Sequence, residues 1–416
     1  MLWVNIIERS GMMKQMEPST VIKLIDVAEE IAKDEQIVPI YCESFSGKQK
    51  YKKQELNKKI KDIFEFCNVN FLIGSGYCYE RLSTLGDLES LIEANAVTNK
   101  DNQTTKEAVE ALILYDFFRN SIYPHKDDIE NNCSFESSDR FILKLFGLLS
   151  DRNDKNLLKR VNLFTTNYDM FFELSLETNK IYYNDGFLGR LVPTFSTQNY
   201  NKIVKQIVQN TERESQIPTV NLYKLHGSLT WAKKSDQVMY RLNPIESLQA
   251  IEEVANVFED EKFMYDKSAE SKLIDSIDLI NMLGTEFSAE LTVQINRFVE
   301  EYQQLHIINP TKKKFEETLL SNVYYDLLRM YSNELEKNNA VLFVFGFSFK
   351  DEHIYSITKR ALLNPSMTMY IFVFDEKDVD SFKDMFKDHN NVYYIYCKNK
   401  NIDLNEFTSM MFGGEI

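Results

Sequence analysis

The sequence contains no closely spaced cysteine pairs. No two of its five cysteines have the two-residue separation typical of zinc sites: they are Cys42, Cys67, Cys78, Cys133 and Cys397. This spacing predicts free thiols in a reducing compartment. It also argues against a zinc ion bound by cysteines, and we expect no metal ligands in this chain.

Long apolar runs are missing as well. No stretch approaches the roughly 20 residues that a helix needs to span a bilayer. The apolar start, Met1 to Val4, meets Glu8 and Arg9 before any long hydrophobic segment develops, so the pattern of a secretory signal is absent. We therefore expect a cytoplasmic protein that does not contact a membrane.

An excess of positive charge is also absent. The chain has 48 basic and 63 acidic residues, which gives a formal net charge of −15. A protein that binds nucleic acid mainly through phosphate contacts shows the opposite balance, so we expect no direct nucleic-acid binding. The lysine-rich segment from Lys48 to Lys61 could form a local basic patch, but the solvated face of a charged helix is the simpler interpretation.

The chain has enough apolar residues to bury a substantial core. It is 416 residues long and 44% hydrophobic. Residues 1–66 are charged and predict an N-terminal helical extension, with a broad apolar face between Val21 and Ile31. Residues 67–416 predict an α/β domain.

Short apolar segments in this domain predict buried strands. These segments are Val69–Ile73, Val161–Thr165, Thr219–Tyr223, Ala340–Phe345, Met369–Phe374 and Val392–Tyr396. Helical patterns separate most of them, which favours a doubly wound, mainly parallel sheet covered on both faces. Two helix-rich stretches, at about residues 87–160 and 240–305, are predicted to be helical insertions around the sheet.

The first predicted strand leads directly into Gly74-Ser75-Gly76. Exposed amides in such a turn could cradle a pyrophosphate near the N-terminus of a helix. The usual dinucleotide fingerprint has a third glycine at the position where this sequence has Tyr79. A tight structural turn therefore explains the pattern equally well, and the residues alone leave both interpretations open.

Polar residues follow the next two strands. The segment from Thr165 to Asp169 lies where ligand-facing groups collect in open α/β sheets, although Asp169 could cap the next helix and Asn167 could satisfy the turn. The segment Leu225-His226-Gly227-Ser228 places an imidazole beside a glycine that leaves room for a ligand. A single histidine is more often structural, but the polar ends of the other strands favour a binding role here.

A further polar segment, Gly346-Phe347-Ser348, follows the strand that ends at Phe345. Its glycine and serine could contact a ribose or a phosphate. Asp351 serves equally well as the N-cap of the following helix, and the role of His353 stays open.

Taken in order, these motifs resemble the sirtuin-like NAD⁺-binding fold, a Rossmann-like α/β fold, over about residues 68–400. The segments Tyr223–Trp231 and Gly346–Ile354 resemble the sirtuin-like subunits of bacterial antiphage systems, including those encoded beside a HerA-type ATPase. The resemblance implies catalytic roles for Asn167 and His226 and a nicotinamide-pocket role for Asp169. The positions for which it implies nucleotide contacts are Gly74, Ser75, Gly76, Thr165, Thr166, Gly346, Phe347 and Ser348.

Two departures from the family pattern refine this interpretation. The first motif of the family usually reads Gly-Ala-Gly followed by serine, whereas here Ser75 replaces the alanine and Cys78 lies near the serine position. Protein deacylases of the family also carry a cysteine-bound zinc module, for which this chain lacks the paired cysteines.

We therefore expect an enzyme that uses NAD⁺ as its substrate, an NAD⁺ glycohydrolase acting in antiphage defence. We expect it to work as a homo-oligomer with a HerA-type ATPase as its partner. The alternatives are a module that senses NAD⁺ or ADP-ribose, and a sirtuin-type protein deacylase or ADP-ribosyltransferase.

Overall fold

A computed structural model describes most of the chain. The described residues are 40–44, 47–82, 88–153, 157–207, 214–234, 237–259, 261, 263, 273–283, 287–307 and 318–413. All the predicted strands are present, as β3 (Asn68–Ile73), β4 (Arg160–Thr165), β10 (Thr219–Lys224), β13 (Ala340–Phe345), β14 (Thr368–Phe372) and β15 (Val392–Cys397). The predicted doubly wound α/β fold is confirmed.

The strands form a nine-stranded sheet in the order β2-β1-β15-β14-β13-β3-β4-β10-β5. The strands from β15 to β5 (Tyr183–Asn184) pair in parallel, whereas β1 (Ile40–Ser44) and β2 (Gly47–Tyr51) form an antiparallel hairpin at one edge. Along the chain, β4 and β10 follow β3 on one side of it in the sheet, and β13 then pairs with the other side of β3. Open sheets of this kind bind ligands at the carboxyl ends of the strands where the order reverses, here between β3 and β13.

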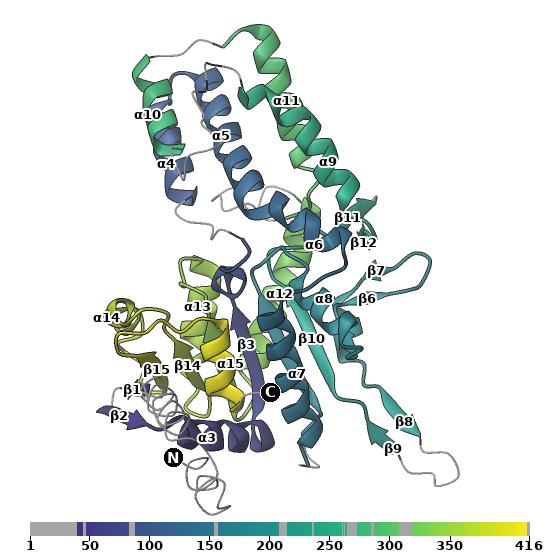
Figure 1. Ribbon diagram of the computed structural model, residues 1–416, viewed down its shortest axis with the longest axis vertical. Helices are drawn as coiled ribbons and strands as arrows, with labels where there is room; N and C mark the ends of the chain where they lie inside the picture. Colours follow the sequence, from purple (N-terminus) through teal and green to yellow (C-terminus); the bar gives the residue numbers. More distant parts are fainter. Residues whose placement is uncertain are drawn as a thin grey trace, which may run out of the picture.

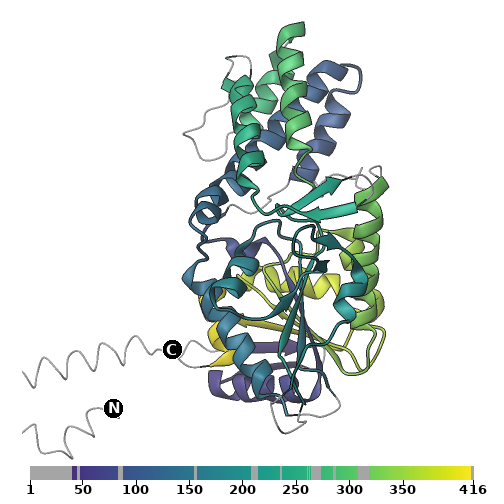
Figure 2. The same ribbon diagram turned by 90° about the vertical axis from the view of Figure 1, so that its right-hand side faces the viewer.

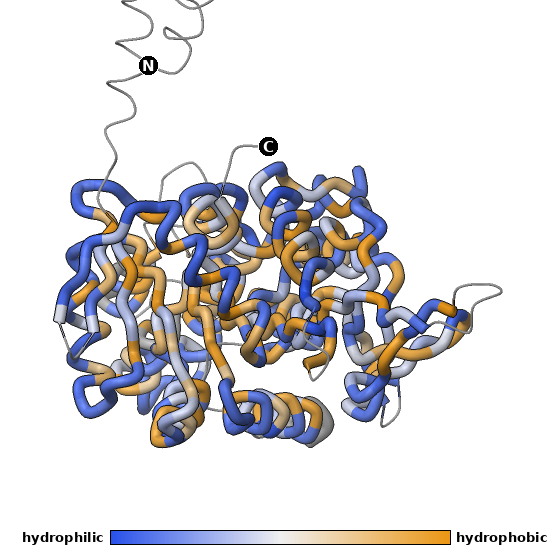
Figure 3. Tube along the Cα trace, turned by 90° about the horizontal axis from the view of Figure 1, so that it is seen from below, coloured by the Kyte–Doolittle hydropathy of each residue, from blue (hydrophilic) through white to orange (hydrophobic). Residues whose placement is uncertain are grey.

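The central strands are hydrophobic because both faces of the sheet are covered. On β3, Val69, Phe71 and Ile73 pack into one core, and Leu72 packs into another on the opposite face. The first core is closed by α3 (Lys53–Phe66), α7 (Glu136–Asp151) and α15 (Leu404–Phe412), and the second by α12 (Thr318–Leu335), α13 (Glu352–Ala361) and α14 (Val379–Met385). The central strands in Figure 3 are accordingly mostly hydrophobic, while the helices around them mix hydrophobic and hydrophilic residues.

A row of buried asparagines crosses the middle of the sheet. Asn70, Asn162 and Asn221 pair in register on β3, β4 and β10. The Nδ2 group of Asn162 donates to Oδ1 of Asn70 at 2.9 Å and to Glu334 of α12 at 2.9 Å, and Asn221 donates to Oδ1 of Asn162 at 3.2 Å. A buried amide without partners is costly, so these bonds link the three strands in one alignment. We call this row the asparagine ladder.

Helices from two distant parts of the sequence form one helical module beside the sheet (Figures 1 and 2). The module contains α4 (Leu88–Thr98), α5 (Gln103–Phe117), α9 (Ile245–Val254), α10 (Leu273–Leu283) and α11 (Ala289–Tyr302). Its core also includes Tyr168, Met170 and Leu229, which follow β4 and β10. The module therefore packs against the segments that leave the carboxyl ends of these strands.

Two details differ from the expectations drawn from the sequence. The prediction of helices through residue 66 is wrong for β1 and β2, and the predicted apolar face between Val21 and Ile31 lies outside the described residues. Strand β2 reads Gly-Lys-Gln-Lys-Tyr and is mostly exposed, so its sequence carries no alternating hydrophobic signal. Helix α7, within the first helix-rich stretch, covers the sheet instead of joining the helical module.

Within the described residues, every helix is too short or too polar to cross a lipid bilayer.

Candidate functional site

The four sequence motifs leave the sheet side by side. Phe345 pairs with Ile73, Ile73 with Thr165, and Thr165 with Lys224. These are the last residues of β13, β3, β4 and β10, so the segments that follow them start from one row across the sheet. The fold brings together the motifs that the sequence placed far apart. We call this the strand-end row.

On the β3 and β13 side of the row, backbone packs directly against backbone. The amide of Gly74 donates to the carbonyl of Phe345 at 3.0 Å, and that of Gly76 donates to the carbonyl of Gly346 at 3.1 Å. A Cβ atom at Gly74 would lie 2.3 Å from the Gly346 oxygen, and one at Gly76 would lie 2.6 Å from the Gly346 Cα. Glycine is thus required at both positions, because the two segments touch there. The amides of Gly74 and Gly76 bind carbonyl groups, so they are not the exposed phosphate donors that the sequence suggested.

Asn167 connects the segment after β4 to the segment after β3. Its side chain is buried, and Nδ2 donates to the carbonyl of Gly74 at 3.1 Å and contacts Sγ of Cys78 at 3.7 Å. Its backbone amide donates to Oγ1 of Thr165 at 3.1 Å. These contacts fix the position of the Asn167 side chain, because they anchor both its backbone and its amide nitrogen.

Asp169 has the structural role that the sequence left open. One of its carboxylate oxygens, Oδ1, accepts a hydrogen bond of 3.0 Å from the amide of Phe171, at the start of α8 (Phe171–Thr178). Burial, and then the negative charge of Asp169, raise the pKa of the Cys78 thiol well above its ordinary value. Cys78 is therefore a neutral thiol between Asn167 and Asp169.

A buried ion pair contacts the segment around Asp169. Nζ of Lys224 lies 3.1 Å from Oε2 of Glu173 and donates to the backbone carbonyl of Asp169. Burial raises the pKa of Glu173 to about 7, although the charge of Lys224 acts in the opposite direction. The pair was not predicted, because its only signal in the sequence is a lysine at the end of an apolar strand.

His226, which follows β10, pairs with the carboxylate of Asp351, which follows β13. Its Nε2 lies 3.1 Å from Oδ2 of Asp351, and both side chains are buried. The second oxygen of Asp351 accepts hydrogen bonds of 3.0 Å from the amides of His353 and Ile354, and so caps α13. The sequence predicted only the capping role of Asp351, and the structure adds its contact with the imidazole.

Gly227 accommodates the protein backbone, which corrects the expectation that it leaves room for a ligand. Its φ of +85° is in the left-handed region, and a Cβ atom here would lie 2.5 Å from the carbonyl oxygen of His306. A β-bridge joins Gly227 to Ile307, in the segment that follows α11. The helical module thus returns to the sheet directly beside His226.

His125 is a second buried histidine close to the site, and no motif in the sequence marks it. Its Nε2 accepts a hydrogen bond of 2.9 Å from the amide of Met170, and its Nδ1 lies 3.4 Å from Oδ2 of Asp128. Since Nε2 accepts, the ring is neutral and Nδ1 carries its proton. His125 thereby holds the backbone next to Asp169.

The remaining predicted residues lie close to the strand-end row in different settings. Thr166 is buried, and its amide donates to the carbonyl of Ile73 at 3.3 Å. Ser75 and Phe347 are half-buried, and Ser348 is exposed. Their contacts with a nucleotide stay a prediction.

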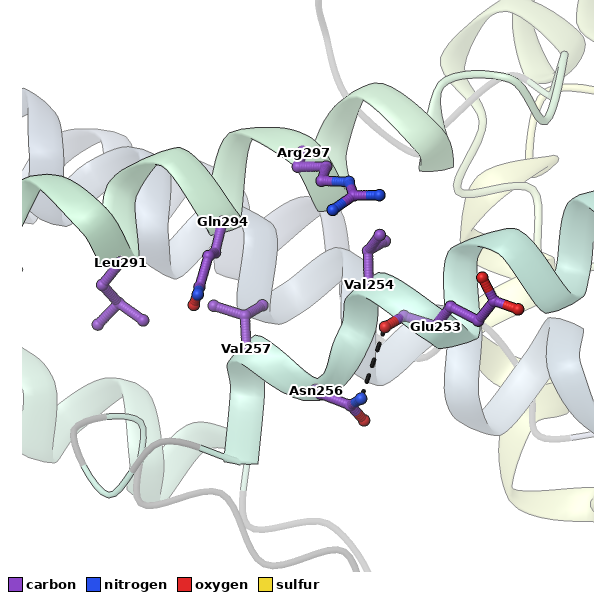
Figure 4. Close-up of a pocket in the computed structure, with 7 residues that line it drawn as sticks. All are labelled: Glu253, Val254, Asn256, Val257, Leu291, Gln294 and Arg297. Atoms are coloured by element: carbon purple, nitrogen blue, oxygen red, sulfur yellow. Dashed lines mark hydrogen bonds between the residues drawn. The ribbon is translucent and has the colours of Figure 1, made fainter.

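A hollow in the helical module lies apart from these residues. It has a volume of about 560 Å³ and lies between α9 with the following turn on one side and α11 on the other (Figure 4). Its lining residues are Glu253, Val254, Asn256, Val257, Leu291, Gln294 and Arg297. It includes none of the residues predicted to bind NAD⁺, so it is separate from the strand-end row.

The part of the chain that the structure describes contains no cluster of histidine, cysteine and acidic residues suited to a metal ion.

Comparison with protein families gives one match near the site. Residues 161–261 match the SIR2-like domain, over a range that begins in β4 and includes both Asn167 and His226. None of the curated proteins searched matches the chain. The match supports the sirtuin-like resemblance of the sequence, and with it an NAD-related function.

Proposed function

We propose that this protein is an NAD⁺ glycohydrolase, which hydrolyses the bond between nicotinamide and ribose and releases nicotinamide and ADP-ribose. The observation that carries the proposal is the buried pair of His226 and Asp351 on the same row of strand ends as Asn167. The SIR2-like match over residues 161–261 supports NAD⁺ as the ligand.

The leaving group makes the reaction feasible with few catalytic side chains. Nicotinamide departs as a neutral molecule from a cationic pyridinium, so it needs no general acid, unlike the leaving group of an ordinary glycoside. Asn167 uses Nδ2 to bind the carbonyl of Gly74, which leaves Oδ1 to accept a hydrogen bond from a ribose hydroxyl or from the attacking water. Its role is to orient these groups.

The contact with Asp351 determines how His226 takes part. An ionised carboxylate only accepts hydrogen bonds, so Nε2 of His226 carries the proton that it donates to Asp351. In the neutral imidazole, Nδ1 is then an acceptor that can take a proton from a ribose hydroxyl or from water. Asp351 thus orients the ring and selects its tautomer, as carboxylates do in other histidine pairs.

A product analysis tests the proposal against its alternatives. The full chain is incubated with NAD⁺, alone and together with a co-expressed neighbouring ATPase, and the products are separated by chromatography. ADP-ribose formed without an acyl peptide supports the glycohydrolase. O-acyl-ADP-ribose formed only with a peptide indicates a deacylase, and NAD⁺ that binds without being cleaved indicates a sensing module.

The cysteine spacing supports a site without zinc, in contrast to the deacylase alternative. We expect cleavage to survive chelation, and elemental analysis to find no stoichiometric zinc. One zinc ion per chain would contradict this expectation and favour the deacylase.

Cleavage of cellular NAD⁺ must be restrained until it is needed. We therefore propose that the chain works in antiphage defence as a homo-oligomer with a HerA-type ATPase, as its resemblance to such subunits implies. Light scattering at micromolar concentration and co-purification with the co-expressed ATPase test this assembly. A monomer that does not bind the ATPase would contradict it.

A further inference from the structure

Arg241, directly after β12 (Gln237–Tyr240), has a guanidinium nitrogen without a partner. Its Nη2 donates to the carbonyl of Gln304 at 3.0 Å, while its Nη1 is buried and makes no hydrogen bond. A buried donor left without a partner is unfavourable, and more so when it is charged. Among the described residues, no acidic side chain forms an ion pair with Arg241, and burial alone lowers its pKa.

Two more basic residues are close to Arg241 in the fold. His306 lies two residues after Gln304, whose carbonyl accepts from Arg241, and Lys233 lies on the strand that pairs with β12. Burial, and then the charges of Arg241 and of Lys233 on β11 (Trp231–Lys234), lower the pKa of His306 to about 4. His306 is therefore neutral at pH 7, and the charged groups that act on it are both cations. Such a cluster contrasts with the rest of a chain that carries a net charge of −15.

The cluster lies beside the segment that carries His226. The amide of Arg241 donates to the carbonyl of Thr230, and the carbonyl of His306 lies against Gly227. Strands β11 and β12 are found where the helical module meets the sheet (Figure 1). The three basic side chains thus come from both sides of the junction next to the candidate site.

We propose that Arg241, His306 and Lys233 form a binding site for a phosphate group. Phosphate oxygens accept hydrogen bonds from guanidinium, imidazole and ammonium groups, so a bound phosphate would supply the missing partner of Nη1. The phosphate comes either from the nucleotide in the candidate site or from a separate phosphate ion. The first source rests on the proposed function, whereas binding itself does not depend on turnover.

The test titrates inorganic phosphate into the full chain and follows the imidazole of His306 by NMR with ¹³C-labelled histidine. The signal is assigned by its loss in His306→Gln. We expect saturable shifts with a dissociation constant of about 1 mM or lower, as a few polar contacts can provide. The titration midpoint of His306 should also rise, because a bound anion favours the imidazolium form.

Two variants and a matched control make the result specific. Arg241→Gln should abolish the saturable shift, and Lys233→Gln, at an exposed side chain, should weaken binding severalfold without affecting folding. Arg329→Gln removes a charge from an exposed arginine of α12 that pairs with Asp326, and it should bind phosphate like the parent. Sodium chloride at equal ionic strength controls for screening.

Addition of ADP-ribose distinguishes the two sources. If the nucleotide supplies the phosphate, ADP-ribose shifts the His306 signal by itself and displaces inorganic phosphate. If the site takes a separate ion, both ligands bind together. The proposal is overturned if phosphate leaves the His306 signal unchanged, or if folded Arg241→Gln and Lys233→Gln respond like the parent. Neither readout needs NAD⁺ cleavage, so failure of the proposed glycohydrolase would be seen separately.

Discussion

The two halves of the strand-end row use the same position in the fold for different purposes. After β3 and β13, Gly74, Gly76 and Gly346 let two backbone segments touch. After β4 and β10, Asn167 and His226 place buried polar side chains at the same edge. A motif at a strand end can therefore pack backbone against backbone in one strand and present buried polar side chains in the next. Substitutions in the first half should reduce stability, and those in the second should reduce activity.

The largest effect is expected in the second half. Asn167→Ala and His226→Ala should each slow NAD⁺ cleavage by about 10²- to 10⁴-fold, as the loss of a positioned proton-transfer or orienting group does. The free energy of unfolding should fall by about 1–3 kcal/mol, because each variant removes a hydrogen bond from a buried group, the carbonyl of Gly74 or the carboxylate of Asp351. Initial rates measured by chromatography, and thermal melting of the same samples, check both parts.

This prediction has a clear opposite outcome. If His226 were only a packing residue, His226→Ala would melt at a much lower temperature while its folded fraction cleaved NAD⁺ at a near-normal rate.

The next effect is expected in the glycine half. Gly346→Ala should lower the free energy of unfolding by about 2–5 kcal/mol, from the cost of a left-handed backbone plus that of overpacking. The φ of Gly346 is +65°, and an added Cβ would lie 2.7 Å from the Cα of Gly76. Urea denaturation measures the loss.

Gly147 of α7 provides a matched control for this prediction. An added Cβ there meets nothing within 4 Å, so Gly147→Ala should raise the free energy of unfolding by about 0.5–1 kcal/mol. Equal effects of the two substitutions would contradict the proposed role of the glycine contact.

Asp351 joins the two halves, because it follows β13 but contacts His226. Asp351→Asn keeps an oxygen to cap α13 but turns an amide group, which donates, toward Nε2 of His226. The imidazole must then carry its proton on Nδ1, so Nδ1 can no longer accept one, and we expect cleavage to slow about 10²-fold, as the loss of a proton acceptor does. Steady-state kinetics check the loss. A rate unchanged from that of the parent would show that Asp351 acts only as a helix cap.

The smallest effect concerns the ion pair of Lys224 and Glu173. It is small because the charge of Lys224 opposes the rise that burial causes in the pKa of Glu173. The folded-state pKa of Glu173, about 7, lies above its ordinary value of 4.5, so the protonated form is favoured by folding. Its contribution to stability is complete below about pH 4.5 and is lost as the pH rises through about 7. Urea denaturation from pH 5 to pH 8 should show this decline, and Glu173→Gln should reduce it. The same slope in both proteins would assign the pH dependence to other groups.

The strands and their polar ends could be predicted from the sequence because their signals are local. Runs such as Val341 to Phe345 are apolar throughout, and the residue after each run marks the strand end. The contacts of these ends could not be predicted in the same way. His226 meets Asp351, and Gly227 meets His306, across long separations in the chain. Strand β2 was missed for a different reason, since its residues are polar and its position depends on β1.

The asparagine ladder has a consequence for how the chain finds its fold. Parallel strands that are apolar along their whole length could pair two residues out of register and still bury similar surface, since side chains alternate with a period of two. A slip of this size would move one strand end by about 7 Å relative to the next. Asn70, Asn162 and Asn221 oppose it, because a slip would break the hydrogen bonds between their buried side chains. Polar groups in the middle of the sheet thus disfavour misaligned strands. The hydrogen bond between Asn167 and Gly74 depends on this alignment, because the two residues follow neighbouring strands.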